Sequence, residues 1–196
     1  AVHENLPAMY KYVNIRKRVL GVEELHMYDV YVPLTKEVDM KISYDKAKEI
    51  VAEGLAPMGK EYISHLKEGF ENRWIDVYEN QGKRSGAYSW GVYGVHPYVL
   101  LNYQENLNNV FTLAHEMGHA LHSYYSDKTQ PYPYAGYKIF VAEVASTCNE
   151  SLLIRDLLKK CTDKQERIYL LNYFIDQFKG TMFRQTMFAE FEKITH

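Results

Sequence analysis

Apolar residues recur every three or four positions along most of the chain, and this spacing predicts a mainly helical protein. Residues 3–19 should form a first helix, which Gly21 is placed to end. The Tyr- and Val-rich stretch 26–34 predicts a short extended segment. Ser43 can cap a second helix that ends at a break containing proline and glycine, and a short helix should follow over residues 59–69.

The pattern changes in the next part of the chain, where glycines interrupt runs of aromatic and β-branched residues. Residues 73–78 alternate between apolar and polar positions like a strand, and residues 80–86 form a turn-rich loop. We expect one or two further strands in residues 87–103. One of them should lie at a sheet edge, because Pro97 lacks the N–H that a central strand donates.

Three longer helices are expected after these strands. They should cover about residues 106–125, 138–160 and 163–193. The sequence therefore predicts an α+β, mainly helical fold with a small sheet, in a single domain over residues 1–196. Its parts are a helical lead-in over about residues 1–80, a sheet segment over 82–103 and a helical part over 106–196.

Composition excludes several classes of function. Of the 196 residues 46% are hydrophobic and 24% are charged, as in ordinary folded proteins. The formal net charge of −2 does not favour a nucleic-acid partner or an acidic membrane surface. Residues 85–104 carry no charged side chain, but glycines, Pro97 and His96 indicate extended chain and not a membrane span.

The cysteines and the chain ends bear on the compartment. Cys148 and Cys161 lie thirteen residues apart on one expected helix, about 20 Å along its axis, which is too far for a disulfide. Two unpaired thiols favour a cytoplasmic protein. The first residue, Ala1, opens into an amphipathic pattern without a signal peptide, and a helical pattern still runs at His196. We therefore expect a fragment or a processed chain.

The helix expected over residues 106–125 contains the pattern H-E-x-x-H. His115 and His119 share one helix face, so both rings can reach one metal ion, and Glu116 lies beside that face. Two fixed ligands with a base beside them suit a hydrolytic zinc site. His122 lies about 10.5 Å further along the axis than His115, so it should be a neighbour and not a ligand. With His122 and Tyr125 in place of Gly and His, the metzincin pattern is excluded.

A five-residue pattern with three fixed residues also arises by chance, and in that case the histidines only cap the helix or pack in the core. The rest of this helix is apolar, however, and unpaired polar groups among apolar neighbours are unfavourable. A third ligand can come from the sequence FVAEVASTCNE, residues 140–150, where Glu143 lies in an apolar run and Glu150 follows on the same helix face. The alternative is that Glu143 and Glu150 belong to a stripe facing solvent.

Together, HEMGH and FVAEVASTCNE resemble peptidase family M3, and most closely its oligoendopeptidase F branch. The sequence GKRSGAYSWGVYGVHPYVLLNY resembles the segment that precedes the zinc helix in that branch. The resemblance, over about residues 82–192, implies a zincin-like catalytic core. It implies the following roles: Zn²⁺ ligands His115, His119 and Glu143, general base Glu116, and a carboxylate at Glu150 that supports a zinc-binding histidine.

The resemblance implies a zinc-dependent endopeptidase that hydrolyses internal bonds of short peptides. An edge strand in residues 87–103 could pair with an extended peptide. Tyr93 and His96 are candidates to line that groove, although both residues could simply pack in the sheet. The tyrosines of the next loop could line it as well.

Family members are much longer and carry His and Tyr groups beyond the equivalent of His196. We therefore expect this chain to bind zinc but to hydrolyse peptides poorly. A zinc aminopeptidase of a related type, a non-catalytic zinc-stabilised helical domain and a metal-free helical module remain as alternatives.

Overall fold

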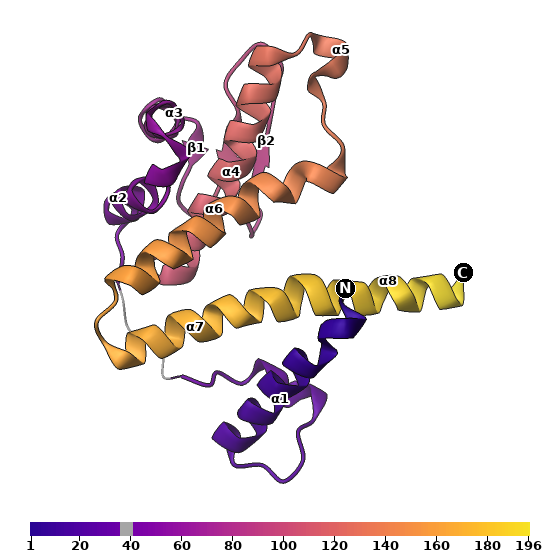
Figure 1. Ribbon diagram of the computed structural model, residues 1–196. Coiled ribbons are helices and arrows are strands. Elements are labelled where there is room, and N and C mark those ends of the chain that lie inside the picture. The colour runs from indigo at the N-terminus through magenta and orange to yellow at the C-terminus, as the bar shows by residue number, and fades with distance from the viewer. Residues whose placement is uncertain (36–40) are drawn as a thin grey trace. The chain divides into compact units, whose positions relative to one another are not determined.

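The computed structural model describes residues 1–35 and 41–196 (Figure 1). As the sequence predicts, the chain is mainly helical with one small sheet. It divides into two compact units, Asp39–Lys160 and the pair of segments Ala1–Val38 and Cys161–His196. We call the first the central unit and the second the terminal unit, and each is described by itself.

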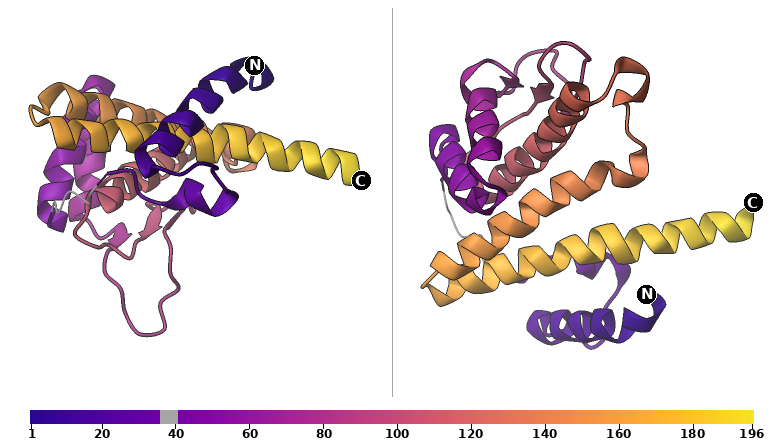
Figure 2. Two further views of the ribbon diagram at one scale, coloured as in Figure 1. Left: turned by 90° about the horizontal axis from the view of Figure 1, so that it is seen from below. Right: turned by 45° about the horizontal axis from the view of Figure 1, so that its top comes forward.

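Five helices and three strands make up the described part of the central unit (Figures 1 and 2). Ser43 caps the first helix by accepting a hydrogen bond from the Lys46 N–H, and Asn106 caps the longest by accepting from the Asn109 N–H. The helices are α2 (Tyr44–Gly54), α3 (Lys60–Glu71), α4 (Leu107–Thr129), α5 (Tyr132–Ala135) and α6 (Ile139–Lys160), with a 3₁₀ turn at Ala56–Met58.

The sheet has the strand order β1 (Ile75–Asp76), β3 (Tyr98–Leu100), β2 (Tyr88–Trp90). β1 pairs with β3 in parallel and β2 pairs with β3 antiparallel. One strand of residues 87–103, β2, lies at a sheet edge, as expected. The strand beside Pro97 is β3, the central one, so the expectation that Pro97 marks the edge strand was wrong. Pro97 lies just before the first residue of β3, so it removes no hydrogen bond from the ladder.

α4 forms the middle of the central unit. β2 lies alongside it, and α6 crosses it (Figures 1 and 2). Eleven of its 23 residues are buried, and Trp74 packs nearby from the start of the sheet. The fully buried apolar side chains of α4 are Val110, Leu113, Ala114, Met117, Ala120 and Leu121. Burial of the middle of α4 explains why residues 110–121 are mainly apolar apart from the HExxH residues.

The terminal unit is built from α1 (Leu6–Leu20) and one long helical run. This run comprises α7 (Lys164–Phe178), a π-helical stretch at Lys179–Phe183 and α8 (Arg184–Thr195). Asp163 caps it by accepting hydrogen bonds from the backbone N–H groups of the second and third helical residues. Gly21 ends α1 in the left-handed conformation, as expected.

The segment expected to be extended at residues 26–34 instead contains a 3₁₀ turn, Met27–Tyr31. The Asp29 carboxylate accepts a hydrogen bond from the His26 N–H and so caps this turn. Arg16, which is buried, donates to the carbonyl oxygens of Asp29 and Val32 and to the Tyr12 hydroxyl. These local hydrogen bonds outweigh the strand preference of Tyr and Val.

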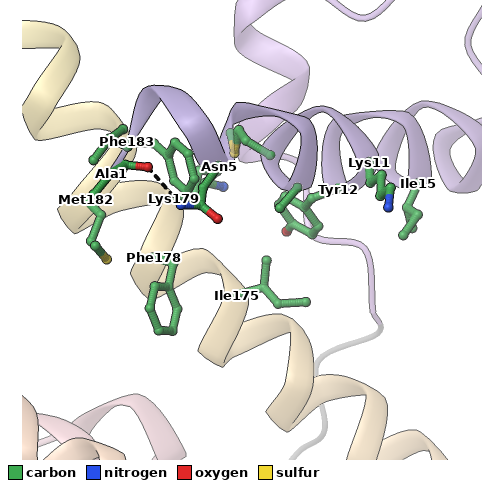
Figure 3. Close-up of a pocket in the computed structure, with 13 residues that line it drawn as sticks. Ala1, Asn5, Lys11, Tyr12, Ile15, Ile175, Phe178, Lys179, Met182 and Phe183 are labelled. Carbon is green, nitrogen blue, oxygen red and sulfur yellow. Dashed lines mark hydrogen bonds between the residues drawn. The ribbon is translucent and has the colours of Figure 1, made fainter.

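A cavity of about 510 Å³ lies between α1 and the α7–π-helix run of the terminal unit (Figure 3). Its lining is mainly apolar and includes Met9, Ile15, Ile175, Phe178 and Met182. In Figure 3 the Asn5 amide donates to the Ala1 carbonyl oxygen at one end of this cavity. None of the sequence-predicted site residues lines it.

In the described ranges, no helix combines the length and the apolar character needed to cross a lipid bilayer. The charge-free stretch 85–104 contains β2 and β3. Cys148 and Cys161 are both free thiols, and Cys161 follows the last residue of α6.

Candidate metal centre

α4 presents the HExxH residues at one place on its surface. His115 and His119 lie one helical turn apart and are half-buried, and Glu116 is buried. The Nε2 atoms of the two rings are 3.1 Å apart. The helix alone therefore brings two nitrogen ligands to one point.

α6 brings a carboxylate to the same point. Glu143 Oε2 lies 3.4 Å from His115 Nε2 and 3.5 Å from His119 Nε2. A tetrahedral ion with bonds of about 2.1 Å requires ligand atoms about 3.4 Å apart. The three atoms form a triangle of that size, so His115, His119 and Glu143 fit a zinc ion and leave one face for a further ligand.

Glu150 lies on the other side of the first histidine ring. Its Oε1 is 2.5 Å from His115 Nδ1. A carboxylate accepts the Nδ1 proton, which leaves the lone pair of Nε2 toward Glu143 and His119. The resemblance predicts such a contact for Glu150, and the structure places the two side chains together.

The electrostatics of the cluster favour a cation. Burial is the main reason why the pKa of Glu116 is raised to about 7; the charge of His115 lowers this pKa, and the charges of Glu143 and Glu150 raise it. Burial and the charge of His115 lower the pKa of His119. Burial also lowers the pKa of His115, but the hydrogen bond and charge of Glu150 outweigh it, so that this pKa is raised. Three carboxyl groups around two imidazoles thus make an acidic, partly desolvated cluster.

His122 stays outside this ligand group, as the helix geometry predicts. Its ring stacks on Tyr137 with centroids 3.8 Å apart. The Tyr137 hydroxyl lies 2.9 Å from Ser123 Oγ, so the loop before α6 is fastened to the C-terminal half of α4. His122 Nδ1 is buried, and no hydrogen-bond partner for it lies in residues 1–35 or 41–196.

The two predicted groove residues differ in their surroundings. Tyr93 is 42% exposed, and its hydroxyl donates to the Gln130 carbonyl oxygen while its ring meets Tyr132 edge to face. His96 is half-buried, and its ring stacks on Trp74 at 5.6 Å with an interplanar angle of 4°. Tyr93 is therefore placed where a ligand could reach it, while His96 is mainly a packing residue of the sheet.

Two buried polar residues of α6 hydrogen-bond at the site, and the sequence patterns did not single them out. Ser146 donates a 2.7 Å hydrogen bond to Glu143 Oε2, and Asn149 donates to the Ala114 carbonyl oxygen. Both side chains are fully buried. The signal of Ser146 in the sequence is a small polar residue three positions after Glu143 and four before Glu150, on the same helix face. Asn149 directly precedes Glu150 and has no such spacing.

Comparison with known proteins identifies the family. The sequence model of Peptidase family M3 matches residues 1–196. Oligopeptidase PepF of Bacillus subtilis (strain 168) is 56% identical over 195 residues, which cover 100% of this chain and 29% of the relative. An oligoendopeptidase F homolog of Lactococcus lactis subsp. lactis (strain IL1403) is 50% identical over 196 residues, 100% of this chain and 32% of the relative.

Solved structures that resemble this chain agree with this family assignment. The crystal structure of oligoendopeptidase-F from Enterococcus faecium superposes with a TM-score of 0.66 at 37% identity, covering 100% of this chain and 26% of that one. A crystal structure from Chlamydophila abortus gives a TM-score of 0.89 at 46% identity, covering 100% of this chain and 33% of that one. The chain spans about a third of the length of the relatives that it matches. It belongs to peptidase family M3, in the oligoendopeptidase F branch, which confirms the resemblance carried by the two helical motifs.

Proposed function

We propose that this chain carries the catalytic centre of a zinc-dependent endopeptidase that cleaves internal bonds of short peptides. The observation that carries the proposal is the triangle of His115 Nε2, His119 Nε2 and Glu143 Oε2, whose edges measure 3.1, 3.4 and 3.5 Å. Two imidazoles and one carboxylate are a ligand set typical of hydrolytic zinc. Membership of a peptidase family supports the reaction class.

Glu116 is proposed as the general base. It lies next to His115 on α4, outside the ligand triangle, and it is buried. When bound, zinc would lower the pKa of a water molecule toward about 7 and polarise the carbonyl group of the peptide bond. Glu116 would accept the proton of the attacking water and deliver it to the leaving amine. Glu150 would hold the His115 ring in its orientation throughout.

The sheet offers a way to hold an extended peptide. β2 is an edge strand beside α4, and a peptide could add to its free edge through main-chain hydrogen bonds (Figure 1). Such pairing depends on the backbone more than on side chains, so broad sequence specificity is expected. We propose Tyr93 as a residue that lines this groove, with His96 supporting it from the packed side of the sheet.

The scope of the proposal follows from the length of the match. Residues 1–196 are proposed as one catalytic-domain fragment, and the isolated chain is expected to hydrolyse peptides slowly, because it spans about a third of its relatives. The free thiols of Cys148 and Cys161 favour a cytoplasmic location.

The proposal is tested by placing this chain in the context of a full-length relative. A chimera in which the chain replaces the matching segment of the Bacillus subtilis relative should bind one zinc ion per chain and cleave a quenched fluorescent peptide. Glu116→Gln in the chimera should keep the zinc and abolish cleavage. His119→Ala should lose both. A chimera that binds zinc but shows no cleavage would overturn the proposal and favour a non-catalytic zinc-stabilised domain.

A zinc aminopeptidase is the second candidate, since related ligand sets serve that reaction. A peptide blocked at its N-terminus separates the two, because an aminopeptidase requires the free amine. Cleavage of the blocked peptide at internal bonds supports the endopeptidase, and cleavage of the unblocked peptide alone supports the aminopeptidase.

A further inference from the structure

We propose that Gly118, Ser146 and Asn149 are positioning residues for the metal centre, a proposal that rests on the metal-binding part of the function proposed above. We call these three residues the helix lock. They join α4 to α6 within the central unit, and they determine where Glu143 and Glu150 stand relative to His115 and His119.

At Gly118 the two helices approach each other closely. A Cβ atom on it would lie 2.7 Å from the Cα of Ser146, 2.9 Å from the Ala145 carbonyl oxygen and 3.0 Å from the Ser146 nitrogen. These are backbone atoms, so no side-chain rotation can relieve the overlap. A larger residue must push α6 away from α4. Glycine is a poor helix former, and this contact explains its presence in the middle of a long helix.

The close approach lies at the centre of the site. Gly118 immediately precedes the ligand His119, and Ser146 lies three residues after Glu143 and four before Glu150. A shift of α6 at this point would therefore move both glutamates at once. The triangle edges of 3.1–3.5 Å leave little room for such a movement, because zinc bonds are defined to within about 0.2 Å.

Asn149 fixes the position of α6 along α4. Its Nδ2 donates a 2.9 Å hydrogen bond to the Ala114 carbonyl oxygen, and its Oδ1 accepts a 2.9 Å hydrogen bond from the Tyr62 hydroxyl of α3. Its side chain is fully buried, so water does not compete for these bonds. Asn149 and Ala114 are the chain neighbours of Glu150 and His115, so this bond sets the register of the 2.5 Å contact between the latter pair.

Ser146 orients the third ligand itself. The Glu143 side chain is 63% exposed, and an exposed glutamate samples many rotamers. The Ser146 hydroxyl hydrogen-bonds to Oε2, the same oxygen that lies 3.4–3.5 Å from the two histidines. The bond restricts Glu143 to the arrangement that completes the triangle, and it leaves lone pairs of the carboxylate for a metal.

A purely structural role is the competing explanation, and the chain offers a matched control. Gly54 of α2 also packs closely against α6, where its Cβ would lie 2.7 Å from Leu153 Cδ1 and 3.2 Å from Leu153 Cα. Leu153 follows Ser146 by seven residues, about 10 Å along α6. Gly54→Ala therefore strains a helix contact on α6 without touching the metal ligands.

The test compares Gly118→Ala, Ser146→Ala and Asn149→Leu with Gly54→Ala in the complete 196-residue chain. Zinc affinity is measured by competition with a chelator, the coordination is followed by the visible absorption spectrum of the Co²⁺ form, and the stability of the metal-free chain is measured by urea unfolding. We expect each lock variant to bind zinc about 10- to 100-fold more weakly and to change the Co²⁺ spectrum. Gly54→Ala should lose stability while its zinc affinity and Co²⁺ spectrum stay those of the parent.

The outcomes separate the possible failures. If the lock variants lose stability but keep the parent's zinc affinity and Co²⁺ spectrum, the three residues only pack and the proposal is overturned. Ser146→Ala removes a single oxygen atom, so it still tests the proposal if Gly118→Ala does not fold. If the parent chain itself binds no zinc, the function proposed above fails first, and the lock proposal fails with it.

Discussion

The contact between Glu150 and His115 allows charge and geometry to be separated experimentally. In Glu150→Gln an amide oxygen can still accept the Nδ1 proton, so ring orientation is kept while the charge is lost. In Glu150→Ala both are lost. Glu150 Oε1 and His115 Nδ1 are 2.5 Å apart, and a hydrogen bond to a carboxylate is charge-assisted. The Glu150 side chain is 18% exposed and that of His115 is 28% exposed, so the bond is partly shielded from water. Such bonds contribute about 1.5–3 kcal/mol, or about 10- to 100-fold in zinc affinity.

Chelator competition at one pH and ionic strength measures the effect. Glu150→Gln should weaken zinc binding about tenfold and Glu150→Ala about 100-fold. Glu53→Gln is the control, because Glu53 also pairs with a residue of α6, Lys160, but at a solvent-exposed position away from the ligands. If Glu150→Ala binds zinc as tightly as the Glu53 control, Glu150 does not support the ring of His115 and this assignment is wrong.

Three further predictions concern stability. Leu121→Ala should lower the free energy of unfolding by about 2–5 kcal/mol in urea titrations, because its side chain is fully buried, whereas Leu171→Ala, 40% exposed, should lose clearly less. Burial raises the pKa of Tyr62 to about 12, so its neutral form stabilises the fold below the ordinary pKa of about 10. That contribution should disappear as the pH rises from about 10 to 12, and Tyr62→Phe should unfold with a flatter alkaline pH dependence; identical pH profiles would contradict it. Asp163→Ala should lower stability by about 1 kcal/mol through loss of the α7 cap, seen as faster amide exchange at the start of that helix.

The helices were predictable because local rules determine them. The helices expected over residues 106–125 and 138–160 correspond to Leu107–Thr129 and Ile139–Lys160, since both segments are long and rich in apolar residues at helical spacing. The segment 26–34 was predicted wrongly, because side-chain hydrogen bonds to the backbone outweigh the strand propensity of Tyr and Val. The sheet was predicted only in outline, since strands of two or three residues carry too few positions for an alternating pattern.

The candidate site also has a part that the sequence predicts and a part that depends on tertiary contacts. The sequence predicts that His115 and His119 meet, because four residues make about one helical turn. It suggests Glu143 because a carboxylate in an apolar helix needs a partner, and because the segment around it resembles that of peptidase family M3. The sequence carried no sign of the role of Gly118, because that role depends on backbone atoms of α6 that would lie within about 3 Å of a Cβ atom at this position. Contacts between helices are tertiary properties, and one sequence does not encode them in any local pattern.

The difference between contacts within one helix and contacts between helices explains why an HExxH pattern alone does not establish a metal site. One helix brings two histidine Nε2 atoms to 3.1 Å from each other without any contact to a second helix. Two ligands alone, however, do not make a site for hydrolytic zinc. The proposed third ligand, Glu143, comes from a second helix, so metal affinity should depend on how closely and in what register α6 crosses α4. A contact at Gly118 that admits no Cβ fixes the spacing, and a buried Asn149 bonded to the Ala114 carbonyl oxygen fixes the register. The residues proposed to complete the metal centre thus include some that would not touch the metal, and they lie at the contact between α4 and α6.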